Sequence, residues 1–204
     1  MNANSEPKTK ILNKKLLAIA VIIIVVAAAV GSWAIYRQSP NSTKAQVTLP
    51  TLNLTIVGAS GQQVVLDSSK IAAYMSYTAN GGYKGENNMT YAGNFTGVPV
   101  LALLDLVGGI KSSDNVTFVG SDGYQYTFTY QQMQGQNINT FNPTTGGAEQ
   151  PSQPLTVMVA YYCNSTILAS DKGPLSVALV GSQGLYTNGY WWVYHLVKIE
   201  IVAQ

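Results

Sequence analysis

Residues 97–109 read Gly-Val-Pro-Val-Leu-Ala-Leu-Leu-Asp-Leu-Val-Gly-Gly and carry the clearest helix pattern outside the N-terminal region. Pro99 suits the first turn of a helix, where its missing N–H has no partner to lose, and the closing glycines are typical of a helix end. Four apolar residues recur at helical spacing, and they are Val100, Leu103, Leu104 and Val107. We predict a helix here that packs into the core. A shorter helix is expected over residues 69–75, with Ser68 or Ser69 as its N-cap.

The segments on both sides of this helix predict strands joined by tight turns. Apolar residues at 52–56 and 64–66 flank the glycine-containing turn 58–63, which predicts a pair of strands. Residues 116–119 and 124–130 flank Ser-Asp-Gly, and the Asp-Gly step is typical of a β-hairpin. The first half of the domain is therefore expected to be rich in strands.

The C-terminal part also predicts strands, interrupted by one long loop. Residues 155–162 and 175–180 are apolar runs suited to buried strands. At the end, Val197, Ile199 and Ile201 alternate with residues of the opposite face, and this period of two predicts a half-buried strand. The polar, turn-rich residues 134–154 predict a loop that is functional or mobile. We assign the α+β class, mostly mixed β-sheet with a few short helices.

Residues 16–35 form an uncharged apolar run of twenty residues. At about 1.5 Å per residue, such a helix spans the roughly 30 Å hydrocarbon core of a bilayer. Four lysines precede the run, whereas only Arg37 and Lys44 follow closely, so we expect the N-terminus in the cytoplasm. The alternative is a cleaved secretory signal. Both interpretations export residues 38–204.

The chain is thus predicted to have four segments: a basic cytoplasmic stub (1–15), a transmembrane helix (16–36), a polar linker (37–49) and an extracytoplasmic domain (50–204). Six lysines against eight acidic residues leave residues 38–204 mildly acidic, which argues against nucleic acid as a partner. Six N-x-S/T sequons would accept glycans in a suitable compartment. They are Asn41, Asn53, Asn88, Asn94, Asn115 and Asn164.

The sequence contains no familiar catalytic motif. It has no phosphate-binding loop of the Walker or dinucleotide type and no G-x-S-x-G elbow. Cys163 ends an apolar run and is expected to be a buried, inert thiol, and His195 is expected to be a packed or rim histidine. With one Cys and one His, a closed zinc site is excluded. We assign no catalytic residue and no metal ligand.

Several short motifs occur in a characteristic order over residues 50–203. They are Gly97-Val-Pro with its helix, Ser121-Asp-Gly-Tyr124, the strand at 155–161, Gly173-Pro-Leu175 with Val180-Gly181, and Trp192-Val193 leading into 197–201. This order resembles the molybdopterin-binding domain of the sulfite oxidase family. The resemblance implies a mixed α+β fold, a molybdenum pterin, and two-electron oxygen-atom or related redox transfer.

The chain departs from this family where the cofactor would bind. A Cys thiolate ligates molybdenum in the family, ahead of the Gly-Val-Pro motif, but residues 71–96 contain no Cys. The resemblance places an Arg at Ser176 and basic residues at Trp191 and Tyr194, where cations would neutralise the phosphate and oxo groups. It therefore implies a retained fold and a lost cofactor site. The nearest basic residues are Lys172 and Lys198.

We predict a membrane-anchored domain at the cell membrane, without molybdenum redox activity, whose aromatic cleft binds a small or neutral ligand or a partner subunit. The candidate cleft residues are Tyr77, Tyr83, Asp122, Tyr124, Tyr190, Trp191, Trp192, Tyr194 and His195. No bound cofactor is expected. One alternative is a genuine molybdopterin-dependent oxidoreductase that holds its cofactor without a Cys ligand. Another is a structural cell-surface or complex-accessory subunit.

Overall fold

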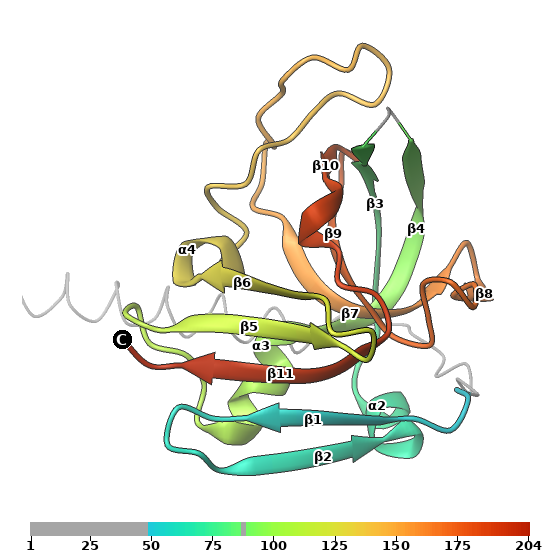
Figure 1. Ribbon diagram of the computed structural model, residues 1–204. Helices are drawn as coiled ribbons and strands as arrows, with labels where there is room; N and C mark the ends of the chain where they lie inside the picture. Colours follow the sequence, from blue (N-terminus) through green and yellow to red (C-terminus); the bar gives the residue numbers. More distant parts are fainter. Residues whose placement is uncertain (1–48, 87–88) are drawn as a thin grey trace, which may run out of the picture. The chain divides into compact units, whose positions relative to one another are not determined.

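The computed structural model describes residues 49–86 and 89–204 (Figure 1). Two β-sheets and a few short helices make up this part, which agrees with the predicted class. The predicted stub, anchor and most of the linker, together with Asn41 and Asn88, lie outside the described residues. Within the described ranges, no helix combines the length and the apolar character needed to cross a membrane.

The first sheet has five strands in the order β2-β1-β11-β5-β6. β1 (Asn53–Val57) and β2 (Gln63–Asp67) form the predicted antiparallel pair, and β5 (Asn115–Gly120) and β6 (Gln125–Thr129) form the predicted hairpin. β11 (Leu196–Val202) lies between the two pairs, parallel to β1 and antiparallel to β5. The last described strand thus joins two hairpins that are separate in sequence.

The second sheet has strands that run steeply across those of the first (Figure 1). Its path is β10-β3-β4-β7-β8, and β9 pairs with both β3 and β7. The strands are β3 (Tyr77–Lys84), β4 (Thr90–Pro99), β7 (Thr156–Cys163), β8 (Thr166–Ile167), β9 (Ser176–Gly181) and β10 (Tyr186–Asn188). β7 and β9 confirm the two predicted apolar strands, and most of their residues are buried.

The helix predicted over residues 97–109 is shorter than expected. Gly97 and Pro99 belong to β4, and the helix α3 begins only at Val100 (Val100–Leu104), followed by a 3₁₀ turn η2 (Asp105–Val107). Gly108 ends it with a φ of 93°, as the glycine pair predicts. The four apolar residues at helical spacing are all buried, which confirms the predicted core face.

The N-cap of the earlier helix α2 differs from the predicted Ser68 or Ser69. α2 (Ser68–Ala73) is capped by Asp67, whose Oδ1 accepts the backbone N–H of Lys70 at 2.9 Å. Ser68 is the first helical residue, and its hydroxyl accepts the N–H of Leu52 at 3.1 Å and donates to the carbonyl of Pro50. Ser68 therefore fastens the start of the domain to α2 instead of capping the helix.

Two strand ends also differ from the sequence prediction. β6 ends at Thr129, because Thr129 and Gln132 form a capping box that begins the short helix α4 (Tyr130–Met133). In β11, a register shift between Leu196 and Lys198 turns Val197 outward, where it is 39% exposed. Such a bulge places the residues after it on the face opposite to the one that uninterrupted alternation along the strand would give them. Ile199 and Ile201 remain buried.

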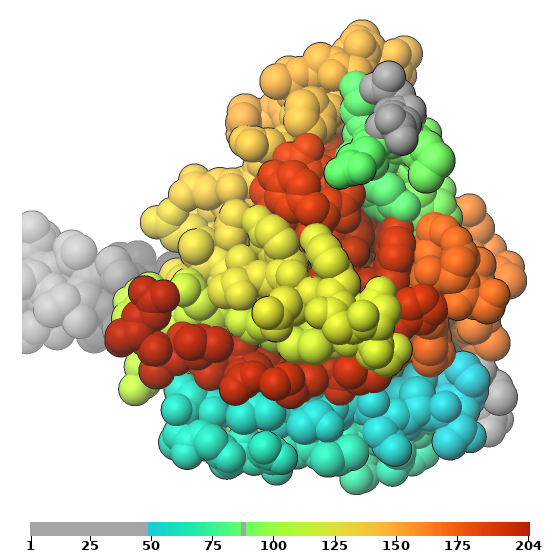
Figure 2. All heavy atoms as spheres, viewed as in Figure 1, coloured from blue at the N-terminus to red at the C-terminus, as the bar shows by residue number. Residues whose placement is uncertain are grey.

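Residues 134–154 contain neither helix nor strand, which confirms the predicted loop. Figure 1 shows it rising beyond β3 and β10, and Figure 2 shows its atoms as the amber region at the same place. Its own polar groups bond to each other: the Asn142 side chain donates to Glu149 Oε2 at 2.6 Å and accepts from the backbone N–H of Thr144 at 2.8 Å. A two-residue bridge from Phe141 to Tyr186 ties the loop to β10.

Candidate functional site

Six of the nine candidate residues divide between two aromatic clusters instead of lining one cleft, and the other three belong to neither cluster. The first, which we call the Tyr83 cluster, brings together rings from β3, β4 and the segment before β11. The distances between ring centroids are 5.3 Å from Tyr83 to Trp192 and 5.9 Å from Tyr83 to Tyr91. Its members are Tyr83, Tyr91, Phe95, Trp192 and Tyr194. It extends from the core, where Phe95 and Trp192 are buried, to the half-buried tyrosines.

Polar groups fix the outer rim of the Tyr83 cluster. The Tyr194 hydroxyl donates a hydrogen bond to the Tyr83 hydroxyl. Lys172 Nζ lies 4.9 Å from the centroid of the Tyr91 ring and 5.6 Å from that of Tyr194. Its ion-pair partner is Asp171, whose side chain is 66% exposed, whereas that of Lys172 is only 17% exposed. The hydrogen bond from Lys172 holds the pKa of the Asp171 carboxyl below its ordinary value.

Raising the pH above about 10 is expected to destabilise the domain through Tyr91 and Tyr194. Burial raises the pKa of both hydroxyls, helped by a hydrogen bond with Cys163 for Tyr91 and with Tyr83 for Tyr194. The unfolded chain therefore loses these protons at a lower pH than the folded domain does. Their stabilising effect is complete below the unfolded pKa and is lost as the pH rises toward the folded pKa.

Urea unfolding at about pH 8 and about pH 11 measures this loss of stability. The Tyr194→Phe variant lacks one of the two ionising hydroxyls, so its free energy of unfolding should fall less between the two pH values. An equal fall in both proteins would contradict the assignment.

The second group, the Tyr126 cluster, lies at the β5–β6 hairpin. Trp191 is 3% exposed, and its Nε1 donates to the Tyr126 hydroxyl at 2.8 Å. Tyr124 donates to the carbonyl of Tyr190 at 2.6 Å, and these two side chains are 41% and 49% exposed. The members of the cluster are Phe118, Tyr124, Tyr126, Phe128, Tyr190 and Trp191. Trp191 thus belongs to the core, and only the outer tyrosines are available to a partner.

The other three candidates, Asp122, His195 and Tyr77, belong to neither aromatic cluster. Asp122 Oδ1 accepts the N–H of Tyr124 at 3.0 Å within the hairpin turn. His195 Nδ1 lies 2.6 Å from the Gly173 carbonyl oxygen, which only accepts, so Nδ1 carries the proton. Tyr77 is the first residue of β3, at the opposite end of this strand from Lys84, and it is half-buried against the core. Among the described contacts, no side-chain hydrogen bond or ring contact joins these three residues to the Tyr83 cluster.

Tyr91 and Phe95 of the Tyr83 cluster, and Lys172 and Cys163 beside it, are not among the site residues predicted from the sequence. Tyr91 and Lys172 lie far apart in sequence, and no spacing pattern connects a tyrosine on β4 to a lysine in a turn. Cys163 was predicted to be buried and inert, but it is partly exposed at the end of β7, where it pairs with Phe95 of β4 and lies beside Gly93. β7 ends at Cys163, and the next residue, Asn164, turns the chain with a φ of 51°.

The residues at the expected cofactor positions do not match the needs of an anionic molybdenum pterin. Ser176 is 3% exposed and its hydroxyl bonds to the neighbouring carbonyl of Val177, while Trp191 and Tyr194 bond to tyrosine hydroxyls. Lys198 pairs with Glu200 at 2.8 Å on β11. Throughout the described ranges, no three His, Cys, Asp or Glu side chains gather in a way that would hold a metal ion.

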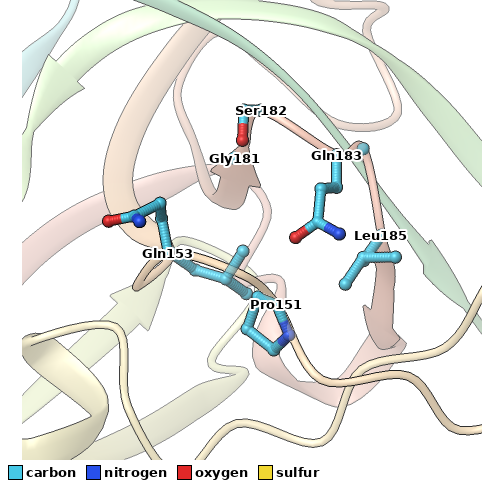
Figure 3. A pocket seen from close by; sticks show the side chains of 8 residues that line it. Pro151, Gln153, Gly181, Ser182, Gln183 and Leu185 are labelled. Carbon is cyan, nitrogen blue, oxygen red and sulfur yellow. The ribbon is translucent and has the colours of Figure 1, made fainter.

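Two hollows lie away from both clusters. The first lies between the end of the 134–154 loop and the β9–β10 turn, where Pro151, Gln153, Gln183 and Leu185 are among the lining residues (Figure 3). Its empty volume is about 180 Å³, most of it open to solvent, with room for about one water molecule. The second is a shallow depression beside α2, lined by Leu66, Lys70, Ala73 and Tyr74. Neither offers the enclosed volume that a small-molecule site requires.

Comparison with known proteins adds one likeness of fold. No family model and no curated protein matches the chain by sequence. Among solved structures, it is similar to the sulfane dehydrogenase SoxCD from Paracoccus pantotrophus, with a TM-score of 0.56 and 14% sequence identity. The match covers 75% of this chain and 38% of the SoxCD chain, so the chain spans well under half of that protein. The domain therefore shares a distant likeness of fold with part of SoxCD.

Proposed function

We propose that the protein is a membrane-anchored, extracytoplasmic binding module, built on a sulfite-oxidase-like fold that no longer carries out molybdenum chemistry. One observation carries this proposal. The positions at which the resemblance expects cations are Ser176, Trp191 and Tyr194, and the polar atoms of all three are already bonded within the chain. Neutral, internally satisfied groups gain nothing from an anionic cofactor and cannot neutralise its charge.

The lack of a thiolate in the expected place supports the same conclusion. Residues 71–96 contain no Cys, and the described part of this segment runs through β3 into β4. Cys163 is on β7, where it pairs in register with Phe95. A soft metal at the expected position would have no soft protein ligand from this segment.

The location at a membrane rests on the sequence of residues 16–35 and on the four lysines before it. The described domain begins near Pro50, whose carbonyl accepts a hydrogen bond from the Ser68 hydroxyl of α2. A binding module so placed would act close to the outer surface of the membrane.

Metal and pterin analysis of the natively expressed protein tests the proposal. We expect far less than one molybdenum or tungsten per chain, and no pterin fluorescence after acid oxidation of an extract. A molybdopterin enzyme purified from the same cells serves as the control, because it shows that the cofactor was available. Near-stoichiometric metal together with pterin would overturn the proposal and support the oxidoreductase alternative.

A further inference from the structure

We propose that Tyr83, Tyr91 and Tyr194, which we call the tyrosine cage, form a binding site for the head group of a small organic ammonium compound, and that Lys172 occupies this site in the absence of ligand. The inference deepens the proposed function and rests on it, because it names the ligand class of the binding module. It replaces the "small or neutral ligand" of the sequence prediction with a cation.

The position of Lys172 is the main observation. Its Nζ lies 4.9 Å from the ring centroid of Tyr91 and 5.6 Å from that of Tyr194, within the distance at which ring faces attract a cation. Tyr83 packs against both rings, with its centroid 5.9 Å from that of Tyr91 and 6.3 Å from that of Tyr194. An ammonium group of the chain itself thus marks the place that an external ammonium would take.

The charge at the rim also favours a cation. Asp171 places a carboxylate at the mouth of the cage, paired with Lys172 and 66% exposed. When an external ammonium replaces that of Lys172, this carboxylate remains in place to pair with it. Tyrosine is neutral at pH 7, and burial raises the pKa of the Tyr91 and Tyr194 hydroxyls further. Their rings therefore attract a cation through their faces.

Lys172 is suited to leave the cage without unfolding its surroundings. It lies in a turn, where its backbone N–H bonds to the Ala169 carbonyl at 2.9 Å. Its ammonium bonds only to Asp171 among the described polar groups, and Asp171 is exposed. Rotation of the flexible four-carbon stem is therefore enough to carry the ammonium into solvent. The rings themselves are held from behind by Trp192 and Phe95, which are buried.

This geometry selects a head group by size and charge. Aromatic faces with one carboxylate are the chemistry by which proteins recognise quaternary ammonium groups. A trimethylammonium group prefers ring faces to water more than a primary amine does, because it offers no N–H to solvent. The same head group occurs on free choline and on phosphatidylcholine, and the two sources are separated by experiment.

Calorimetric titration of the Lys172→Ala variant with choline is the decisive test. Removal of the internal competitor is expected to raise the affinity for choline about tenfold over that of the wild type, since the free cage is then fully populated. The uncharged isostere 3,3-dimethylbutan-1-ol should show no such gain, because it lacks the charge that the rings attract. Equal responses to the two compounds, or no binding of choline to the variant, would overturn the proposal.

Changes in the rings provide a matched pair of variants in the Lys172→Ala background. Tyr91→Phe keeps the ring face and should retain choline binding, whereas Tyr91→Leu removes the face and should abolish it. Circular dichroism of each variant confirms that the domain is folded. If a ring variant does not fold, the shift of the Tyr91 ring protons on titration of the Lys172→Ala protein reports the same contact, and an unchanged shift contradicts it.

Vesicles of phosphatidylcholine, compared with vesicles of phosphatidylglycerol, distinguish the two sources of the head group. Selective sedimentation of the variant with phosphatidylcholine assigns the lipid, and binding of free choline alone assigns the soluble compound. Neither result depends on the metal analysis described above. Failure of choline binding in a metal-free protein therefore contradicts the cage alone, and bound molybdopterin contradicts the proposed function alone.

Discussion

Replacement of Trp192 by alanine is expected to lower the free energy of unfolding by about 3–5 kcal/mol, the cost of removing a large aromatic side chain from a core. Trp192 is 3% exposed and packs against Tyr83 at 5.3 Å and Phe95 at 5.1 Å between ring centroids. Its Nε1 also donates to the Thr187 hydroxyl at 2.8 Å, and Thr187 is completely buried. The alanine variant therefore leaves both a cavity and a buried hydroxyl with a lost partner.

Tyr190→Ala is the matched control for this substitution. Tyr190 lies two residues away, also carries a large ring, and is 49% exposed. Its removal is expected to cost about 1 kcal/mol or less, because the side chain remains largely in water in the folded domain. Urea unfolding of both variants measures the difference. Similar losses of stability would show that Trp192 does not hold the core together.

Gly97→Ala is expected to destabilise the domain by about 3 kcal/mol or more, at the upper end of the cost of overpacking. A Cβ at this position would lie 2.1 Å from the carbonyl oxygen of Val159 and 2.7 Å from Cα of Ala160. Both atoms belong to the backbone of β7, so no change of rotamer relieves the contact. The two strands must move apart, next to the register shift between Thr96 and Gly97.

Gly147→Ala is the control for Gly97→Ala, because it makes the same change of residue type at a position where a Cβ has room. At Gly147, in the long loop, a Cβ would meet only Thr145 Oγ1, at an ordinary distance of 3.5 Å. Gly147→Ala is expected to change the free energy of unfolding by about 0.5 kcal/mol or less. Chemical denaturation of the two variants measures the difference between their free energies of unfolding. A Gly97→Ala protein as stable as the Gly147→Ala protein would refute the close approach of β4 and β7.

Local patterns in the sequence predicted most of the elements but not where they end. The spacing of Val100, Leu103 and Leu104 identified the buried face of α3 correctly. It did not reveal that Gly97 and Pro99 extend β4, because that assignment depends on pairing with β7, some sixty residues later. The outward turn of Val197 has the same origin, since the bulge in β11 is defined by its pairing with β5.

The site was harder to predict, because neighbours in sequence are not neighbours in space here. Trp191 ends the 3₁₀ turn η3 (Gly189–Trp191) and Trp192 follows it. Their rings enter different clusters, one against Tyr126 and the other against Tyr83. The dense aromatic segment therefore predicted a single cleft where the structure has two packed groups. The contact of Lys172 with Tyr91 joins a turn to a strand, and no periodicity in the sequence indicates it.

The central position of β11 in the first sheet has a consequence for folding during synthesis. β1 and β5 are both without a partner on one side until residues 196–202 have been synthesised and delivered to the same compartment. Pairing over such a separation is slow, and unpaired strand edges invite association with other chains in the meantime. A chain that still lacks its last strand would thus expose the free edges of β1 and β5 to neighbouring chains until residues 196–202 pair with them.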